Sequence, residues 1–198
     1  MKVTIFDYGA GNLHSLAKAI KEDGIDVCLE TDPARAARTD VLILPGVGAF
    51  GAAAARLAPG RTDMRDALDA GLPCLGICLG MQLLFDSSEE GEGDGLGFFS
   101  GAVTRIRARR APHIGWNTLE RTKDRIFSSA PVSLAYFANG FVCRPQSSTD
   151  VIAWTTHETD RFPAAVRRGN TVGVQFHPEK SSRNGVRFIR AFLDEAAR

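Results

Sequence analysis

The residues best suited to chemistry are a cysteine between two glycines and a histidine near a glutamate. Cys78 lies in Gly76-Ile77-Cys78-Leu79-Gly80, between a short apolar run of strand type and an apolar helical segment. A G-x-C-x-G sequence in this position predicts a sharp strand-to-helix elbow that lifts one nucleophilic side chain above a sheet. The glycines leave room for neighbouring backbone, and the positive end of the helix favours a thiolate at Cys78.

A histidine partner for this cysteine is found near the C-terminus. The chain has four histidines, at positions 14, 113, 157 and 177, and His177 is followed by proline and Glu179. Proline favours an extended conformation at the residue before it, and residues two apart in extended chain share a side. Glu179 is therefore expected to reach the imidazole of His177 and stabilise its protonated form. Taken alone, His-Pro-Glu is also compatible with a turn that carries a solvated acid. His157, in a polar run, is expected to be exposed.

Length and composition are those of an ordinary globular protein. The chain has 198 residues, of which 44% are hydrophobic and 24% charged, and a formal net charge of +1. This length suits a single domain over residues 1–198, and the low net charge disfavours nucleic acid or a membrane as a partner. The N-terminus lacks the pattern of a signal peptide, and no apolar run approaches the about 20 residues that cross a bilayer. A cytoplasmic location is expected.

The other cysteines have surroundings typical of structural residues. Cys28, Cys74 and Cys143 each lie in apolar, strand-like segments, where cysteine usually acts as a small buried hydrophobic residue. The spacing of Cys74 and Cys78 differs from the C-x-x-C of zinc sites and redox dithiols. We expect no metal and no other cofactor.

The elements that must position these side chains alternate between strand and helix over the first half of the chain. The predicted strands are Lys2–Phe6, Val27–Leu29, Val41–Leu44 and Cys74–Ile77, and the predicted helices are 13–21, Ala52–Leu57, Thr62–Ala70 and Leu79–Phe85. This alternation is typical of a doubly wound, flavodoxin-like α/β fold with a mostly parallel central sheet, whose sites gather at the carboxyl ends of the strands. Asp7–Asn12, Pro45–Gly48 and Cys78 are expected to share that rim. The first loop is not a dinucleotide fingerprint, because His14 stands where G-x-G-x-x-G requires glycine.

The second half of the chain has shorter elements and ends in a helix. Strands are predicted at 103–107, Leu134–Val142, Val151–Thr155, Ala164–Arg167 and Val172–Phe176, and a helix at Asn184–Ala197. This pattern predicts an additional antiparallel portion that flanks or extends the sheet. The acidic, glycine-rich segment 87–97 is expected to be a solvated loop. The basic cluster of Arg105, Arg107, Arg109 and Arg110 is typical of a solvated face, with docking onto an acidic protein as the alternative.

These motifs together resemble one enzyme family. P-C-L-G-I-C-L-G-M-Q around Cys78 and G-V-Q-F-H-P-E around His177 resemble the class I, triad-type glutamine amidotransferases. Within that class, four stretches resemble the glutaminase subunits of imidazole glycerol phosphate synthases. They are D-Y-G-A-G-N at 7–12, L-P-G-V-G-A-F-G at 44–51, P-H-I-G-W-N at 112–117 and F-H-P-E-K-S-S at 176–182.

The resemblance implies hydrolysis of glutamine to glutamate and ammonia. The ammonia would pass to a separate (β/α)8-barrel cyclase subunit in histidine biosynthesis, with which this chain would form a heterodimer. Cys78 would attack the side-chain amide to form a thioester, with His177 as base and then as acid toward the leaving ammonia. The N–H groups of Val47, Gly48 and Leu79 would form the oxyanion hole.

The resemblance also implies binding residues. Gln82 and Glu90 would hold the head group of glutamine, although Glu90 is also compatible with a solvated loop acid. Asn12, Trp116, Asn117 and Lys180 would face the partner. The chain departs from the family at Asn139-Gly140-Phe141, where a histidine and a small hydroxyl residue commonly precede an aromatic residue. Substrate binding survives this change if backbone groups make the contacts, and is altered if a side chain is needed.

Two other classes of protein would share part of this pattern. A non-catalytic interaction module could keep the fold, but the retained triad residues argue against it. A stand-alone cysteine hydrolase could share the elbow, but the P-G-V-G loop and the lack of an extra substrate domain disfavour it.

Overall fold

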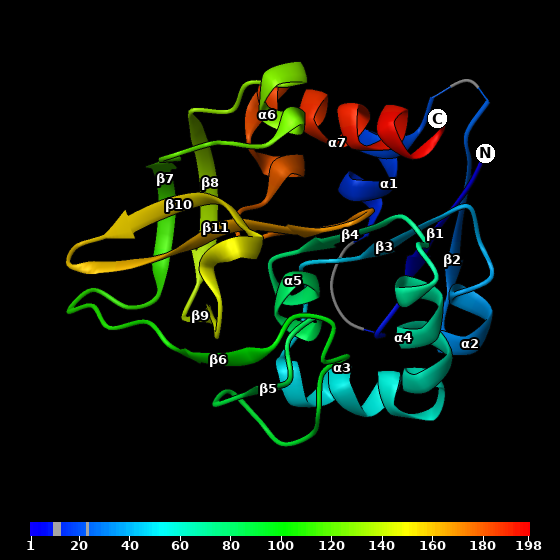
Figure 1. Cartoon of the computed structure of the whole chain (residues 1–198), viewed down its shortest axis with the longest axis horizontal. Helices are drawn as coiled ribbons and strands as arrows, with labels where there is room; N and C mark the ends of the chain where they lie inside the picture. The colour runs from blue at the N-terminus through cyan, green and yellow to red at the C-terminus, as the bar shows by residue number, and fades with distance from the viewer. Residues whose placement is uncertain (10–12, 23) are drawn as a thin grey trace.

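A seven-stranded sheet in the order β10-β11-β12-β4-β3-β1-β2 forms the centre of the molecule (Figure 1). The computed structural model describes residues 1–9, 13–22 and 24–198. Strands β1 (Lys2–Phe6), β2 (Asp26–Glu30), β3 (Val41–Leu44), β4 (Cys74–Ile77) and β12 (Thr171–Val174) run parallel. Strands β11 (Asp160–Arg168) and β10 (Val151–His157) extend the sheet antiparallel. The predicted α/β fold with a mostly parallel sheet and an antiparallel portion is confirmed.

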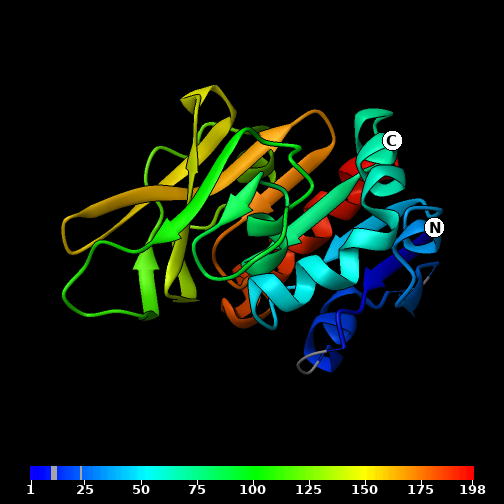
Figure 2. The same cartoon turned by 90° about the horizontal axis from the view of Figure 1, so that it is seen from below.

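Helices cover both faces of the parallel strands (Figures 1 and 2). One face carries α1 (His14–Ile20), α6 (Arg125–Ser129) and α7 (Ser182–Ala196), and the other carries α2 (Pro33–Ala36), α3 (Phe50–Leu57), α4 (Arg61–Asp69) and α5 (Leu79–Leu83). Every residue of β3 and β4 is buried because these strands are covered from both sides. Among the residues that the structure describes, no helix is both long and apolar enough to cross a membrane.

Two small sheets and the β10–β11 hairpin lie at the end of the molecule away from both termini (Figure 2). One small sheet contains β5 (Ser87–Ser88), β6 (Gly101–Arg105) and β9 (Phe141–Pro145), and the other contains β7 (His113–Thr118) and β8 (Leu134–Asn139). The prediction of one strand over Leu134–Val142 is therefore wrong. Two strands meet at Gly140: β8 ends before this residue and pairs with β7, whereas β9 begins after it and pairs with β6.

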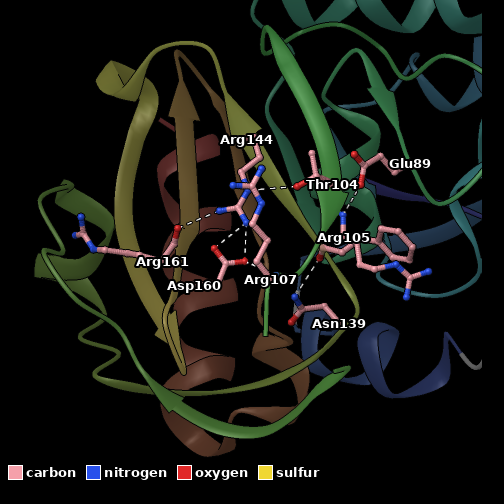
Figure 3. Close-up of polar contacts among 9 residues, drawn as sticks. Glu89, Thr104, Arg105, Arg107, Asn139, Arg144, Asp160 and Arg161 are labelled. Atoms are coloured by element: carbon pink, nitrogen blue, oxygen red, sulfur yellow. Dashed lines mark hydrogen bonds and ion pairs between the residues drawn. The ribbon is translucent and has the colours of Figure 1, made fainter. Parts of the chain in front are cut away.

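The connection between β6 and β7, which carries Arg107, Arg109 and Arg110, is held through its backbone. The buried carboxylate of Asp160 accepts the Arg107 N–H at 2.7 Å and pairs with the Arg144 guanidinium at 2.6 Å (Figure 3). Glu158 accepts the N–H of Arg109 at 2.6 Å. These contacts hold the main chain while the side chains of Arg107 and Arg109 stay exposed.

The expectation of an exposed His157 is wrong. The polar run that contains it forms the end of β10, so its ring is half-buried and stacks on that of His113 with centroids 4.1 Å apart. Burial, and next the neighbouring His157, lower the pKa of His113 to about 4. His113 is therefore neutral near pH 7.

Candidate active site

The G-x-C-x-G sequence forms a sharp turn between β4 and α5. Cys78 has φ +48° and ψ −103°, a combination that residues other than glycine rarely adopt. A Cβ at Gly80 would lie 1.9 Å from the Leu44 carbonyl oxygen, and one at Gly76 would lie 2.7 Å from the Gly80 oxygen. Only glycine fits at either position, so the close packing of β3, β4 and α5 holds Cys78 in its strained conformation.

The segment after β12 brings His177 and Glu179 to the same rim. Because β12 is the parallel neighbour of β4, the residues that follow the two strands lie side by side. His177 Nδ1 is 2.8 Å from Glu179 Oε1. A Cβ built on Gly46 would lie 3.0 Å from both Cys78 Cβ and His177 Cε1. The cysteine and histidine side chains therefore converge beside the loop that follows β3.

The surroundings of His177 favour its protonated form. Burial disfavours a charged ring, but hydrogen bonds to Cys78 and Glu179, together with the charges of both partners, outweigh it and raise the pKa of His177 to about 9. The imidazolium form therefore predominates near pH 7. Such a ring can pair with a thiolate and donate a proton to a leaving group.

Gln82 lies one turn beyond Cys78 and is buried against a backbone carbonyl. Its Nε2 donates to the Phe141 oxygen at 3.1 Å and to Gln175 Oε1 at 3.4 Å. Asn139 Nδ2 donates to the same Phe141 oxygen at 3.1 Å (Figure 3). Asn139-Gly140-Phe141 is the stretch that departs from the family pattern, and it contacts Gln82 through the backbone oxygen of Phe141. Because both N–H groups of Gln82 are used, its Oε1 is the group left to accept a hydrogen bond from a ligand.

Sequence reasoning missed one residue of this site, Gln175. Its side chain is fully buried, with Nε2 3.5 Å from Cys78 Sγ. A signal for it is present in the sequence, because Gln175 stands two residues before His177 in a segment that follows a strand. The structure has bends at 175 and 176, so the signal is the closeness of Gln175 to a reactive His177 and not an extended conformation.

Comparison with known proteins places the chain in a family. The sequence model of the glutamine amidotransferase class-I family matches residues 4–196. This chain belongs to the class I glutamine amidotransferases. The amidotransferase is 43% identical over 195 residues to imidazole glycerol phosphate synthase subunit HisH of Pyrococcus furiosus, covering 96% of this chain and 97% of the relative. It is 40% identical over 205 residues to the subunit of the same name from Halobacterium salinarum, covering 98% of this chain and 94% of the relative.

Solved structures share the fold of the amidotransferase. A crystal structure of a glutamine amidotransferase superposes with a TM-score of 0.77 at 21% identity, covering 99% of both chains. PurLQS from Thermotoga maritima gives a TM-score of 0.71 at 19% identity, covering 98% of both chains. At these identities the likeness shows the fold alone.

The loop that follows β3 lies beside Cys78 and His177. Glu90 is exposed, and its Oε2 accepts the N–H of Phe50 at the start of α3 at 3.0 Å. Gly48 has φ +103°, and the N–H of Leu79 begins α5, where the first donors have no partner within the helix. The oxyanion roles of Val47, Gly48 and Leu79, and the substrate role of Glu90, stay predictions.

The residues predicted to face a partner of the amidotransferase differ in their exposure. Trp116 is 50% exposed, and Lys180 is also at the surface. Asn117 is half-buried and donates its Nδ2 to the Thr156 oxygen at 2.9 Å, so its amide already serves an internal contact. Asn12 lies outside the described residues.

Proposed function

We propose that this amidotransferase is the glutaminase subunit of an imidazole glycerol phosphate synthase. It hydrolyses glutamine to glutamate and ammonia in the cytoplasm and delivers the ammonia to a (β/α)8-barrel cyclase subunit, which closes the imidazole ring in histidine biosynthesis. The proposal depends most on the convergence of Cys78 with the hydrogen-bonded pair of His177 and Glu179. The relatives that are about 40% identical over nearly the whole chain support the assignment to this synthase.

The chemistry starts from a protonated His177 beside Cys78. The Cys78 thiolate attacks the side-chain carbonyl carbon of glutamine, and the negative charge moves to the oxygen, which the N–H groups of Val47, Gly48 and Leu79 would stabilise. His177 gives its proton to the nitrogen, and ammonia leaves as the thioester forms. The neutral His177 then takes a proton from water, whose oxygen attacks the thioester and releases glutamate. This second step restores the thiolate and the imidazolium.

A glutaminase assay with and without a cyclase subunit tests the proposed function. We expect slow hydrolysis by the free subunit and faster hydrolysis once the cyclase and its ligand bind, because the Pro45–Gly48 loop must turn an N–H toward the oxyanion. Equal turnover with and without the cyclase would favour a stand-alone cysteine hydrolase. No hydrolysis in either case would favour a non-catalytic module.

Substitution Glu179→Gln should move the alkaline limb of the pH profile. In the native chain, kcat/KM for glutamine should fall as pH rises through about 9, where His177 loses its proton. Without the Glu179 carboxylate the pKa of His177 falls, so the same limb should appear at lower pH and the rate near pH 8 should drop roughly 10–100-fold. An unchanged limb in the complex with the cyclase would show that Glu179 does not act on His177.

An exposed apolar face on the β7–β8 sheet is our candidate for the cyclase interface. Ile114 and Trp116 alternate along β7 and are 66% and 50% exposed, and Leu134 on β8 is 47% exposed. Exposed apolar clusters of this kind mark interaction surfaces. The sheet also touches the triad, because the His177 N–H donates to the Tyr136 carbonyl of β8 at 2.8 Å. A subunit bound to this face would therefore contact the sheet whose Tyr136 carbonyl accepts the hydrogen bond from the catalytic His177.

Substitution Trp116→Ala should weaken binding of the cyclase by roughly 10–100-fold, because buried tryptophans often dominate the energy of an interface. Titration calorimetry with the cyclase subunit measures this effect. Leu29→Ala provides the control, since Leu29 is a similarly exposed apolar residue, 56% exposed, on the edge strand β2. Equal losses in both variants, or none in either, would reject the β7–β8 face as the interface.

A further inference from the structure

A glutamine that lies outside the triad contacts the reactive sulfur. Gln175 follows β12 directly, and its side chain is fully buried. Its Nε2 lies 3.5 Å from Cys78 Sγ, and its Oε1 accepts from Gln82 Nε2 at 3.4 Å. Its backbone N–H donates to the oxygen of Ala164 in β11 at 2.9 Å, and this bond holds Gln175 beside β11. Each end of the Gln175 carboxamide therefore contacts a residue of the site.

The direction of this carboxamide is determined by a backbone carbonyl. The Phe141 oxygen can only accept, so the Gln82 atom 3.1 Å away must be its nitrogen. The same nitrogen faces Gln175, and the atom of Gln175 that it meets must be the oxygen. The nitrogen of Gln175 is then left to face the sulfur of Cys78. A thiolate is the stronger acceptor for this N–H, because hydrogen bonds to charged groups are about twice as strong as neutral ones.

We propose that Gln175 is a catalytic residue that stabilises and aims the Cys78 thiolate through its Nε2–H. This role rests on the proposed glutaminase function and adds a donor to its site. His177 gives up its proton during the reaction, whereas the amide of Gln175 does not titrate. The donor is therefore in place both when the thiolate attacks glutamine and when the sulfur leaves the second tetrahedral intermediate as a thiolate.

Three variants separate this role from a merely structural one. Gln175→Glu keeps an oxygen for Gln82 but loses the donor to sulfur, and Gln175→Met loses both contacts at similar volume. Gln146→Met makes the same chemical change at an exposed glutamine. The first measurement is the rate of alkylation by iodoacetamide, followed by mass spectrometry on the peptide that contains Cys78, in the intact chain without glutamine. The second is the steady-state kinetics of glutamine hydrolysis in the complex with the cyclase.

Both Gln175 variants should alkylate at Cys78 roughly tenfold more slowly than the native chain at pH 7, and higher pH should restore the rate, because the thiolate has lost a hydrogen bond. Both should lower kcat for glutamine, and Gln175→Met alone should also raise KM through the loss of the Gln82 contact. Gln146→Met should match the native chain. Native alkylation rates in both Gln175 variants, in a preparation whose native form hydrolyses glutamine, would overturn the role of Gln175. If the Gln175 variants alkylated more slowly but the native chain did not hydrolyse glutamine, the proposed function would be contradicted. The contact of Gln175 with the Cys78 sulfur would still be supported.

Discussion

Replacing Cys78 with alanine should abolish glutamine-dependent ring synthesis while ammonia-dependent synthesis continues. The thiolate is the only group that forms the acyl intermediate in this mechanism, so hydrolysis should fall by at least about 10⁴-fold. The cyclase performs its own reaction at another site and should accept free ammonia unchanged. Synthesis by the complex is measured with either glutamine or an ammonium salt as the nitrogen source.

Two controls define the Cys78 result. Cys28→Ala removes a half-buried thiol on β2 and should leave both activities at the native level. Titration with the cyclase should give the same affinity for Cys78→Ala as for the native chain. If Cys78→Ala lost the ammonia-dependent activity as well, the cysteine would have a structural role and the nucleophile would have to be sought elsewhere.

Substitution Gly80→Ala should destabilise the protein more than any other single methyl group added in the site. Alanine is the better helix former by about 1 kcal/mol, so helix propensity alone predicts a gain in stability. The added Cβ would lie 1.9 Å from the Leu44 oxygen and 2.5 Å from its carbonyl carbon, which are backbone atoms of a central strand. We expect this clash to lower the free energy of unfolding by about 3–5 kcal/mol net.

Gly140→Ala is the matched control for the change at Gly80. A Cβ at Gly140 would have its nearest neighbour at 3.8 Å, an ordinary contact, so its free energy of unfolding should change by less than about 1 kcal/mol. Urea unfolding of both variants measures the difference. A Gly80→Ala protein as stable as the native chain would mean that β3, β4 and α5 do not pack as closely as described.

The parts of the fold and the site that the sequence predicted are those set by local pattern. The apolar run Val41–Leu44 and the G-x-C-x-G elbow each have a local cause, and the structure has β3 and the turn at Cys78 where they were expected. The spacing of His177 and Glu179 likewise predicted their hydrogen bond. The extended conformation assumed for that prediction is present at His177 but not beyond it, because Pro178–Lys180 form a 3-10 helix. These features depend on residues close in sequence.

The parts that sequence reasoning missed depend on contacts between distant segments. The break at Gly140 occurs because β8 and β9 pair with different strands, and such pairing leaves no local pattern. The contact of Gln175 with Cys78 joins the residues that follow the neighbouring strands β12 and β4. The bond from His177 to the Tyr136 carbonyl joins the site to the β7–β8 sheet. The strand order of the central sheet brings Gln175 to Cys78, and the packing of the separate β7–β8 sheet against the segment after β12 brings Tyr136 to His177.

The most direct test of Cys78 as the nucleophile is to trap the acyl intermediate. The complex with the cyclase is mixed with glutamine, quenched in acid and digested, and the peptide that contains Cys78 is examined by mass spectrometry. The mechanism predicts a mass increase of one γ-glutamyl group on Cys78, lost on treatment with hydroxylamine and missing in Cys78→Ala. Turnover of glutamine with an unmodified Cys78 peptide, or with the acyl group on another residue, would contradict it.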